Sequence, residues 1–292
     1  MSRTNKMINV LEKDGIVIFT SAEELDYRSG FEMSKTWADA ILVDFEHDPF
    51  DTVGLKSFMT GISDGFISNN LDFMPSVITT LPSNCMTSDE VLYNSWQVRH
   101  VLGAGVHGVL HTHARTPEAV KTFVATTRYP FNKLGLNDGL SEGLRGSGGQ
   151  EFASKIWHIT AEEYLSKADP WPLNQDGELI LGLKIEDKYC LEKAPEITKI
   201  PGIAFAEWGP GDMGMSFGFP EAHDPPYPKE MDMARGLIKL ECDKNGMAFY
   251  SSWRDPSMSE KDQIKYVIQI VGARIVMVES MELATFARSL KE

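Results

Sequence analysis

Two carboxylates that each follow an apolar run are the residues of this chain best suited to chemistry. Glu186 closes the run ELILGLKIED at 178–187, and Asp212 lies in IAFAEWGPGDMG at 203–214. Runs of this kind predict buried parallel strands, whose carboxyl ends meet at one rim. Either acid alone could be solvated or could cap the next helix. Together they predict a divalent metal site, for Mg²⁺ or Mn²⁺ with Co²⁺ as a further option, because open oxygen sites suit such cations.

A third acidic strand end, DFEHDP at 44–49, carries Asp44, Glu46 and His47. A carboxylate near an imidazole can orient the ring and raise its basicity, which a general base requires at neutral pH. The residues are equally compatible with a surface histidine in an acidic loop. On the pattern alone both readings stay open.

Two further groups lie at predicted strand ends. His111 and His113 form an HxH pair, which could ligate zinc or iron if both imidazoles share one face, or could be a polar strand end. Lys184 precedes Glu186 by two residues, so both side chains should point into the same opening. There the lysine could pair with Glu186, bind a substrate carboxylate or form a Schiff base.

These residues need a scaffold of short strands that alternate with helices. Helical periodicity is found at 117–129, 161–168 and 260–271. Eight apolar runs with this alternation favour a closed (β/α)₈ barrel, in a single domain over residues 1–292, over an open sheet. A glycine-rich segment at 131–150 reads as a mobile loop. The eight predicted strands are 15–20, 40–45, 76–80, 108–112, 179–185, 203–208, 247–252 and 273–278.

The composition of the chain limits the classes of binding partner and the cellular compartment that can be expected. The 292 residues carry a net charge of −14 and no basic cluster, which argues against binding to nucleic acid or to an anionic membrane. A small anionic substrate would therefore need a local positive centre such as a bound cation. Three widely spaced cysteines and the lack of an 18-residue apolar stretch predict a soluble, cytoplasmic protein.

Four stretches together resemble the HpcH/HpaI aldolases, a family of metal-dependent 2-oxo acid aldolases that includes hydroxy-oxo-heptanedioate and dehydro-deoxy-glucarate aldolases. The resemblance implies a (β/α)₈ barrel of the phosphoenolpyruvate/pyruvate-domain type, usually assembled as a homo-oligomer, a hexamer built as a trimer of dimers. It also implies reversible aldol cleavage that gives pyruvate or a related oxo acid plus an aldehyde. The stretches are LVDFEHDPFD at 42–51, 101–130 with Arg128-Tyr129-Pro130 at its end, KIED at 184–187 and KIPGIAFAEWGPGDMGMSFGFP at 199–220.

The same resemblance assigns roles to individual positions. Glu186 and Asp212 match the two metal ligands. His47 matches the catalytic base, and Asp44 matches the acid that orients it. The backbone amides of Gly211 and Asp212 match those that receive the substrate carboxylate, in a turn that begins with Gly209 and Pro210.

The chain departs from the family pattern at three positions. Thr79 stands where the third strand normally ends in an arginine that steadies the enolate oxygen. Lys184 stands where the family has a glutamine, and His111 replaces a proline on the fourth strand. We hypothesise that Lys184 supplies the positive charge lost with the arginine, and that Lys184 and Thr79 line the substrate site.

Two other functions stay open at this point. A metal-dependent hydrolase or decarboxylase of a small carboxylate could use His111 and His113 together with Glu186. A barrel that has lost the arginine could instead bind a metabolite without catalysis. Tight Zn²⁺ binding by the two histidines would favour the first of these, whereas oxygen ligands alone favour the aldolase.

Overall fold

The computed structural model describes residues 3–251 and 255–291. Eight parallel strands in this part of the chain form a closed barrel, because β4 pairs with β6 and β1 pairs with β9. The predicted (β/α)₈ barrel is therefore confirmed, and each strand falls within a predicted run or differs from it by one residue; residue 252 lies outside the described residues. The strands are β1 Val17–Ser21, β2 Ala40–Val43, β3 Ser76–Thr79, β4 Gly108–His111, β6 Leu179–Lys184, β7 Phe205–Trp208, β8 Ala248–Ser251 and β9 Ile275–Met277.

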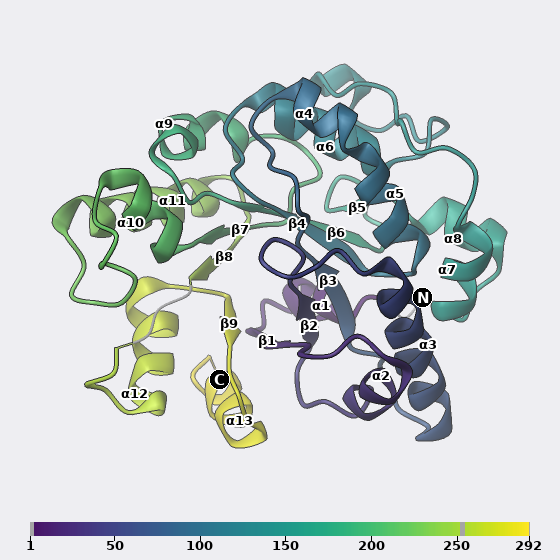
Figure 1. Ribbon diagram of the computed structural model, residues 1–292, viewed down its shortest axis with the longest axis horizontal. Coiled ribbons are helices and arrows are strands. Elements are labelled where there is room, and N and C mark those ends of the chain that lie inside the picture. The colour runs from purple at the N-terminus through teal and green to yellow at the C-terminus, as the bar shows by residue number, and fades with distance from the viewer. Residues whose placement is uncertain (1–2, 252–254, 292) are drawn as a thin grey trace.

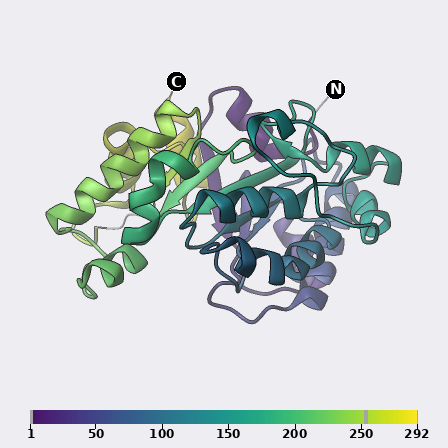
Figure 2. The same cartoon turned by 90° about the horizontal axis from the view of Figure 1, so that it is seen from above.

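A short strand that the sequence did not predict, β5 (Pro170–Trp171), pairs with the start of β6. Helices lie around the outside of the sheet, as Figures 1 and 2 show. The periodicity at 117–129, 161–168 and 260–271 corresponds to α6, α8 and α12, the last of which continues into a π-helical turn, Tyr266–Val271. None of the helices in the described ranges is both long and apolar enough to cross a bilayer. The α-helices are α1 Lys6–Glu12, α2 Tyr27–Met33, α3 Thr52–Ser68, α4 Ser88–Tyr93, α5 Ser95–Gly103, α6 Pro117–Thr127, α7 Gln150–Ile156, α8 Ala161–Lys167, α9 Lys188–Ile197, α10 Pro210–Phe217, α11 Lys229–Lys244, α12 Glu260–Lys265 and α13 Met281–Ser289.

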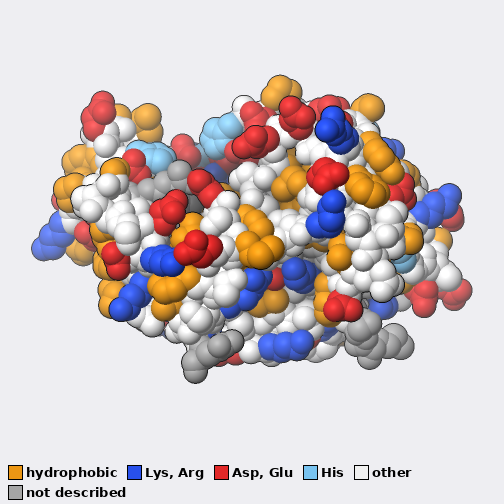
Figure 3. Space-filling view, turned by 90° about the horizontal axis from the view of Figure 1, so that it is seen from below, with side chains coloured by type: hydrophobic (Ala, Val, Ile, Leu, Met, Phe, Trp, Pro, Cys, Tyr) orange, Lys and Arg blue, Asp and Glu red, His pale blue; other side chains and the backbone are white. Residues whose placement is uncertain are grey.

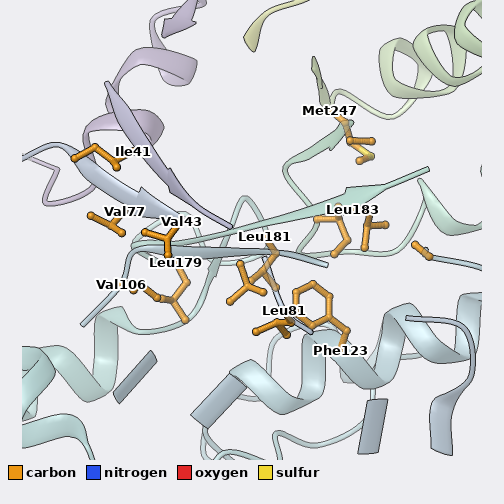
Figure 4. Packing of buried hydrophobic residues seen from close by; sticks show 14 of the residues in the cluster. Ile41, Val43, Val77, Leu81, Val106, Phe123, Leu179, Leu181, Leu183 and Met247 are labelled. Carbon is orange, nitrogen blue, oxygen red and sulfur yellow. The ribbon is translucent and has the colours of Figure 1, made fainter. Parts of the chain in front are cut away.

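Both faces of the barrel sheet are buried, which explains why the strands read as nearly continuous apolar runs. Ile78 and Ile180 belong to the cluster inside the barrel. Their neighbours Val77 and Leu181 belong to the cluster between the sheet and the helices, where Phe123 of α6 packs (Figure 4). Because side chains alternate, this parity decides which strand-end residues face the open mouth of the barrel.

The opposite end of the barrel is covered by α1, whose Met7, Ile8 and Leu11 join the inner cluster. Asn5, which caps α1, donates from Nδ2 to the carbonyls of His107 and Glu178. The buried His107 ring accepts a hydrogen bond at Nδ1 from the Val77 amide, and burial lowers its pKa to about 3. The barrel therefore opens only toward the carboxyl ends of its strands within the described structure.

The glycine-rich segment at 131–150 is tied to α6 and the chain just after it. The amides of Leu144 and Arg145 donate to the carbonyls of Ala125 and Arg128, at 2.8 and 2.9 Å. The Arg145 side chain is 2% exposed and donates to the Tyr164 hydroxyl at 2.8 Å. Leu144 and Arg145 are thus part of the packed structure, whereas the sequence predicted a mobile loop throughout 131–150.

Candidate active site

Four side chains with metal-binding atoms converge at the open mouth of the barrel. One ligand atom each from Glu46, His113, Glu186 and Asp212 lies within 4.8 Å of all the others. Glu186 stands two residues past the end of β6, and Asp212 lies in the first turn of α10, just after β7. The structure brings together the two residues that the sequence marked as ligands, and their role as ligands stays a prediction.

Glu186 is fully buried and is held from two sides. Its Oε1 accepts a hydrogen bond from the His113 amide at 3.1 Å, and its Oε2 lies 3.0 Å from Lys184 Nζ. The Lys184 contact is an ion pair, and Oε2 accepts no hydrogen bond from any described residue. Burial raises the pKa of Glu186 to about 7, against the opposing effect of Lys184. An oxygen in this position has a free lone pair for a cation.

Gly209 makes room for this packing. A Cβ atom at Gly209 would lie 3.0 Å from Glu186 Oε2, closer than side chains normally approach. The glycine therefore lets the turn before α10 pass next to the carboxylate.

Lys184 lies on the inner face of the barrel, in register with Ile180 and Gly182. Its Nζ contacts Glu46 Oε2 at 2.5 Å as well as Glu186, so the expected pairing with Glu186 is present. Burial lowers the pKa of Lys184, but the nearby carboxylates, Glu207 first, more than reverse this and raise it. The lysine is thus a charged ammonium ion held among acids, which does not suit a Schiff-base nucleophile because that requires the neutral amine.

His47 forms a pair with Asp44 beside this cluster. The ring Nδ1 lies 2.8 Å from Asp44 Oδ2, while the side chain is 63% exposed and so can reach a substrate. The hydrogen bond with Asp44 raises the pKa of His47. Burial raises the pKa of Asp44, but hydrogen bonds from His47 and Thr80 outweigh it, and the pKa falls below its usual value.

The third strand contributes a different threonine from the one expected. Thr79 is fully buried and, alternating with Ile78 of the inner cluster, faces the helix layer, so the prediction that it lines the substrate site is wrong. Thr80 occupies the rim instead. Its hydroxyl donates to Asp44 Oδ1 at 2.8 Å and accepts from the amides of Phe45 and Glu46.

The two histidines of the HxH pair are separated. The His111 ring is buried with its centroid 4.8 Å from that of Phe123, on the helix side of β4, and burial lowers its pKa to about 3. His113 follows the strand with a φ of 47°, so the strand parity assumed for the pair no longer applies. Among the described residues, no metal-binding group contains both, so the alternative in which the two rings ligate one zinc or iron ion is not supported.

The amino end of α10 lies at the same rim. Gly209 caps the helix without a side-chain hydrogen bond, and Pro210 occupies its first turn. His223 lies over this turn, since a Cβ at Gly211 would be 3.2 Å from its ring. A cavity of about 410 Å³ begins at Pro210 and His223 and runs along β8 and β9 to α12. Figure 3 shows histidine and acidic side chains gathered at one edge of the molecule, beside a depression.

Curated proteins similar in sequence to this chain are aldolases. No family model matches the chain. A hydroxypyruvate/pyruvate aldolase of Sagittula stellata is 24% identical over 207 residues, which are 70% of this chain and 66% of that protein. A 2-keto-3-deoxy-L-rhamnonate aldolase of Klebsiella pneumoniae is 25% identical over 164 residues, 56% of this chain and 54% of that protein. The chain thus spans about half to two-thirds of the length of these curated relatives.

Solved structures show the same likeness over the whole chain. An HpcH/HpaI aldolase/citrate lyase family protein from Burkholderia cenocepacia has a TM-score of 0.71 at 17% identity, covering 99% of this chain and 97% of that one. The HpcH/HpaI aldolase from Desulfitobacterium hafniense has a TM-score of 0.70 at 16% identity, covering 98% and 95%. The chain is similar to the HpcH/HpaI aldolases. The resemblance inferred from the motifs is confirmed, and at these identities the solved structures establish the fold alone.

Sequence reasoning missed two residues that hold the HpcH/HpaI-like site together. Asp187 lies 3.1 Å from the His113 ring and 2.9 Å from Arg115 Nε, and it caps α9 by accepting from two backbone amides. Its position directly after Glu186 was the available signal, because an acid before a helix predicts a cap. Thr80 was missed because the apolar run was read one residue too long.

Proposed function

We propose that this chain is a divalent-metal-dependent carbon–carbon lyase of the class II aldolase type. It cleaves a 2-oxo acid to pyruvate or a related oxo acid plus an aldehyde, and it catalyses the reverse condensation. The observation that carries the proposal is the convergence of Glu186 and Asp212 beside the His47–Asp44 pair at the barrel mouth. The aldolase names of the curated relatives support it.

The donor set fits a divalent cation. Glu186 and Asp212 supply carboxylate oxygens, and Oε2 of the fully buried Glu186, which is ion-paired with Lys184 but accepts no hydrogen bond from a described residue, is an acceptor that a cation would satisfy. Hard divalent ions such as Mg²⁺ and Mn²⁺ prefer oxygen ligands, and Co²⁺ accepts the same set. Such an ion, when bound, stabilises the negative charge that develops on the oxo acid during cleavage.

His47 is the group proposed to move the proton. With its Nδ1 hydrogen-bonded to Asp44, the exposed ring keeps Nε2 for the proton transfer. Cleavage of an aldol requires removal of the proton from the hydroxyl group on the carbon that becomes the aldehyde. A neutral imidazole oriented by a carboxylate performs this step, and in the reverse direction it returns the proton.

Two positive features bind the substrate in this proposal. The amides of Gly211 and Asp212 at the start of α10 receive the carboxylate of the oxo acid, because the amino end of a helix favours an anion. Lys184 supplies an ammonium group beneath the carboxylate cluster, between Glu46 and Glu186. This fixed charge offsets the repulsion that an acidic site would otherwise exert on an anionic substrate.

The wider setting is also part of the proposal. We infer a single-domain, cytoplasmic protein that assembles as a homo-oligomer, a hexamer made of three dimers, as the resemblance implies. Light scattering on the purified full chain measures the mass directly, and a monomer at micromolar concentration contradicts the assembly without affecting the proposed chemistry.

The function is tested by measuring pyruvate release and aldehyde condensation across a panel of 2-oxo acids and aldehydes. The full chain should be active with added Mn²⁺ or Mg²⁺ and inactive after chelation. Glu186→Gln should abolish activity, whereas Glu196→Gln, which alters an exposed carboxylate on α9, should leave it unchanged. Absence of any cleavage or condensation with every metal refutes the proposal. Product release from a small carboxylate without an aldehyde would instead identify a hydrolase or decarboxylase.

A further inference from the structure

The carboxylate cluster at the barrel mouth contains one imidazole. A ring nitrogen of His113 lies within 4.8 Å of the ligand atoms of Glu46, Glu186 and Asp212. His47 belongs to a second group, with Asp44 and Glu46. His113 is therefore the histidine whose ring lies among the expected ligands.

The backbone holds His113 in an uncommon conformation. Its φ of 47° is in the left-handed region, where a residue other than glycine is rare unless its surroundings compel it. In this conformation the His113 amide donates to Glu186 Oε1 at 3.1 Å, so the same turn positions both the imidazole ring and the Glu186 carboxylate. Conformations of this kind concentrate at sites that bind ligands.

Asp187 fixes the orientation of the His113 ring. Its Oδ2 lies 3.1 Å from Nδ1, and the carboxylate is itself held by Arg115 and by the amides of Tyr189 and Cys190. The same Nδ1 lies 3.8 Å from Glu186 Oε1, so Asp187 holds the ring against the cluster, and a carboxylate on a ring nitrogen is the usual way in which a metal-binding imidazole is oriented. The side chain is only 20% exposed, which limits its use as a surface group.

Glu46, the fourth member of the cluster, forms an ion pair with Lys184. Its Oε2 is the closer partner of Lys184 Nζ, at 2.5 Å against 3.0 Å for Glu186 Oε2, so a cation bound through this oxygen would compete most directly with the ammonium group. His113 has no cationic partner among the described residues. It is the better third ligand for this reason.

We propose that His113 is a third protein ligand of the cation held by Glu186 and Asp212, and that its nitrogen shifts the preference of the site from Mg²⁺ toward Co²⁺ and Zn²⁺. Imidazole suits borderline metals, whereas Mg²⁺ prefers oxygen alone. This inference rests on the metal site of the proposed function. It adds a ligand that an all-carboxylate site lacks.

The test is spectroscopic and does not depend on turnover. The full chain is loaded with Mn²⁺, and pulsed electron paramagnetic resonance detects a coordinated imidazole nitrogen. Wild type should show this coupling and His113→Gln should lose it. His47→Gln and His223→Gln should both keep it, because these exposed rings lie outside the four-residue cluster. Competition binding should show affinity for Co²⁺ falling about 10-fold or more in His113→Gln, and affinity for Mg²⁺ falling about threefold or less.

The outcomes separate this inference from the proposed function. If wild type binds one cation in a Glu186-dependent manner without nitrogen coupling, the His113 assignment is overturned and the lyase proposal stands. Coupling that persists in His113→Gln also overturns the His113 assignment and leaves the lyase proposal standing. If no divalent cation binds wild type, the proposed function and the inference fail together. Absence of coupling in wild type overturns the assignment even if His113→Gln does not fold, and loss of coupling in His47→Gln or His223→Gln assigns the bound nitrogen to that ring instead.

Discussion

Removing the charge of Lys184 is the most informative single perturbation of this site. Its Nζ is held between Glu46 and Glu186, and the side chain is 10% exposed. Lys184→Met keeps most of the side-chain volume and leaves the carboxylates without their ammonium partner. In the metal-free protein these acids then repel one another in a poorly solvated site.

The size of the effect follows from burial. Breaking a buried ion pair by removing one partner costs about 3–5 kcal/mol. A chain of this size loses about 2–4 °C in melting temperature for each kcal/mol, so the metal-free variant should melt about 6 °C or more below wild type. A divalent cation replaces the missing positive charge. Added Mn²⁺ should therefore stabilise Lys184→Met more than wild type, and the variant should bind the ion more tightly.

Activity should move in the opposite direction from metal affinity. If Lys184 supplies the charge lost with the family arginine, turnover of metal-saturated Lys184→Met should fall about 10²-fold or more. Lys184→Arg, which keeps the charge, should lose less. Thermal melts with and without Mn²⁺, together with pyruvate release, measure all three quantities. A variant with unchanged melting temperature and turnover within a few-fold of wild type would refute this account of the lysine.

Three further outcomes are expected. Asp44→Asn should lower turnover about 10-fold or more and move the acidic limb of the kcat/KM profile to lower pH, because loss of the carboxylate removes what raises the pKa of His47; an unmoved limb contradicts the pairing. His107 has a folded pKa of about 3, below its unfolded value, so its stabilising contribution is complete above about pH 6.5 and is lost as pH falls toward 3, by about 1.4 kcal/mol per pH unit. Urea unfolding should show a shallower loss of stability over this range in His107→Gln than in wild type, and equal slopes would exclude the histidine as the cause. Arg128→Met should destabilise the fold by about 3–5 kcal/mol, since Asp169, 2.7 Å from Arg128 Nε and fully buried with it, loses its ionic partner and keeps only the side-chain hydrogen bond from Asn174 among the described residues. The unfolding midpoint measures this, and a change below about 1 kcal/mol would count against it.

The barrel and the convergence of Glu186 with Asp212 were predictable because both follow from apolar runs that mark buried parallel strands. Glu186 and Asp212 follow strands whose apolar character marks them as internal, and parallel strands bring such ends together. The pairing of Asp44 with His47 needed only a short separation in a turn. These features are local or follow from topology.

The errors arose where strand parity ends. Thr79 and Thr80 are adjacent, and only the register of β3 against β2 decides which hydroxyl reaches Asp44. His113 was paired with His111 on the assumption of a continuing strand, which the left-handed backbone at His113 breaks. β5 was missed because two residues that include a proline carry no periodic signal. Each of these positions is set by long-range packing that a single sequence does not display.

The helix that covers the barrel floor has a consequence for the order of assembly. Asn5 is synthesised before its partners Ser76, His107 and Glu178, which lie 71, 102 and 173 residues further along the chain. The contacts of α1 therefore cannot be complete, and Met7 and Ile8 stay uncovered, until Glu178 has left the ribosome. Pulsed hydrogen exchange during refolding should find the amides of α1 protected no earlier than those of β6.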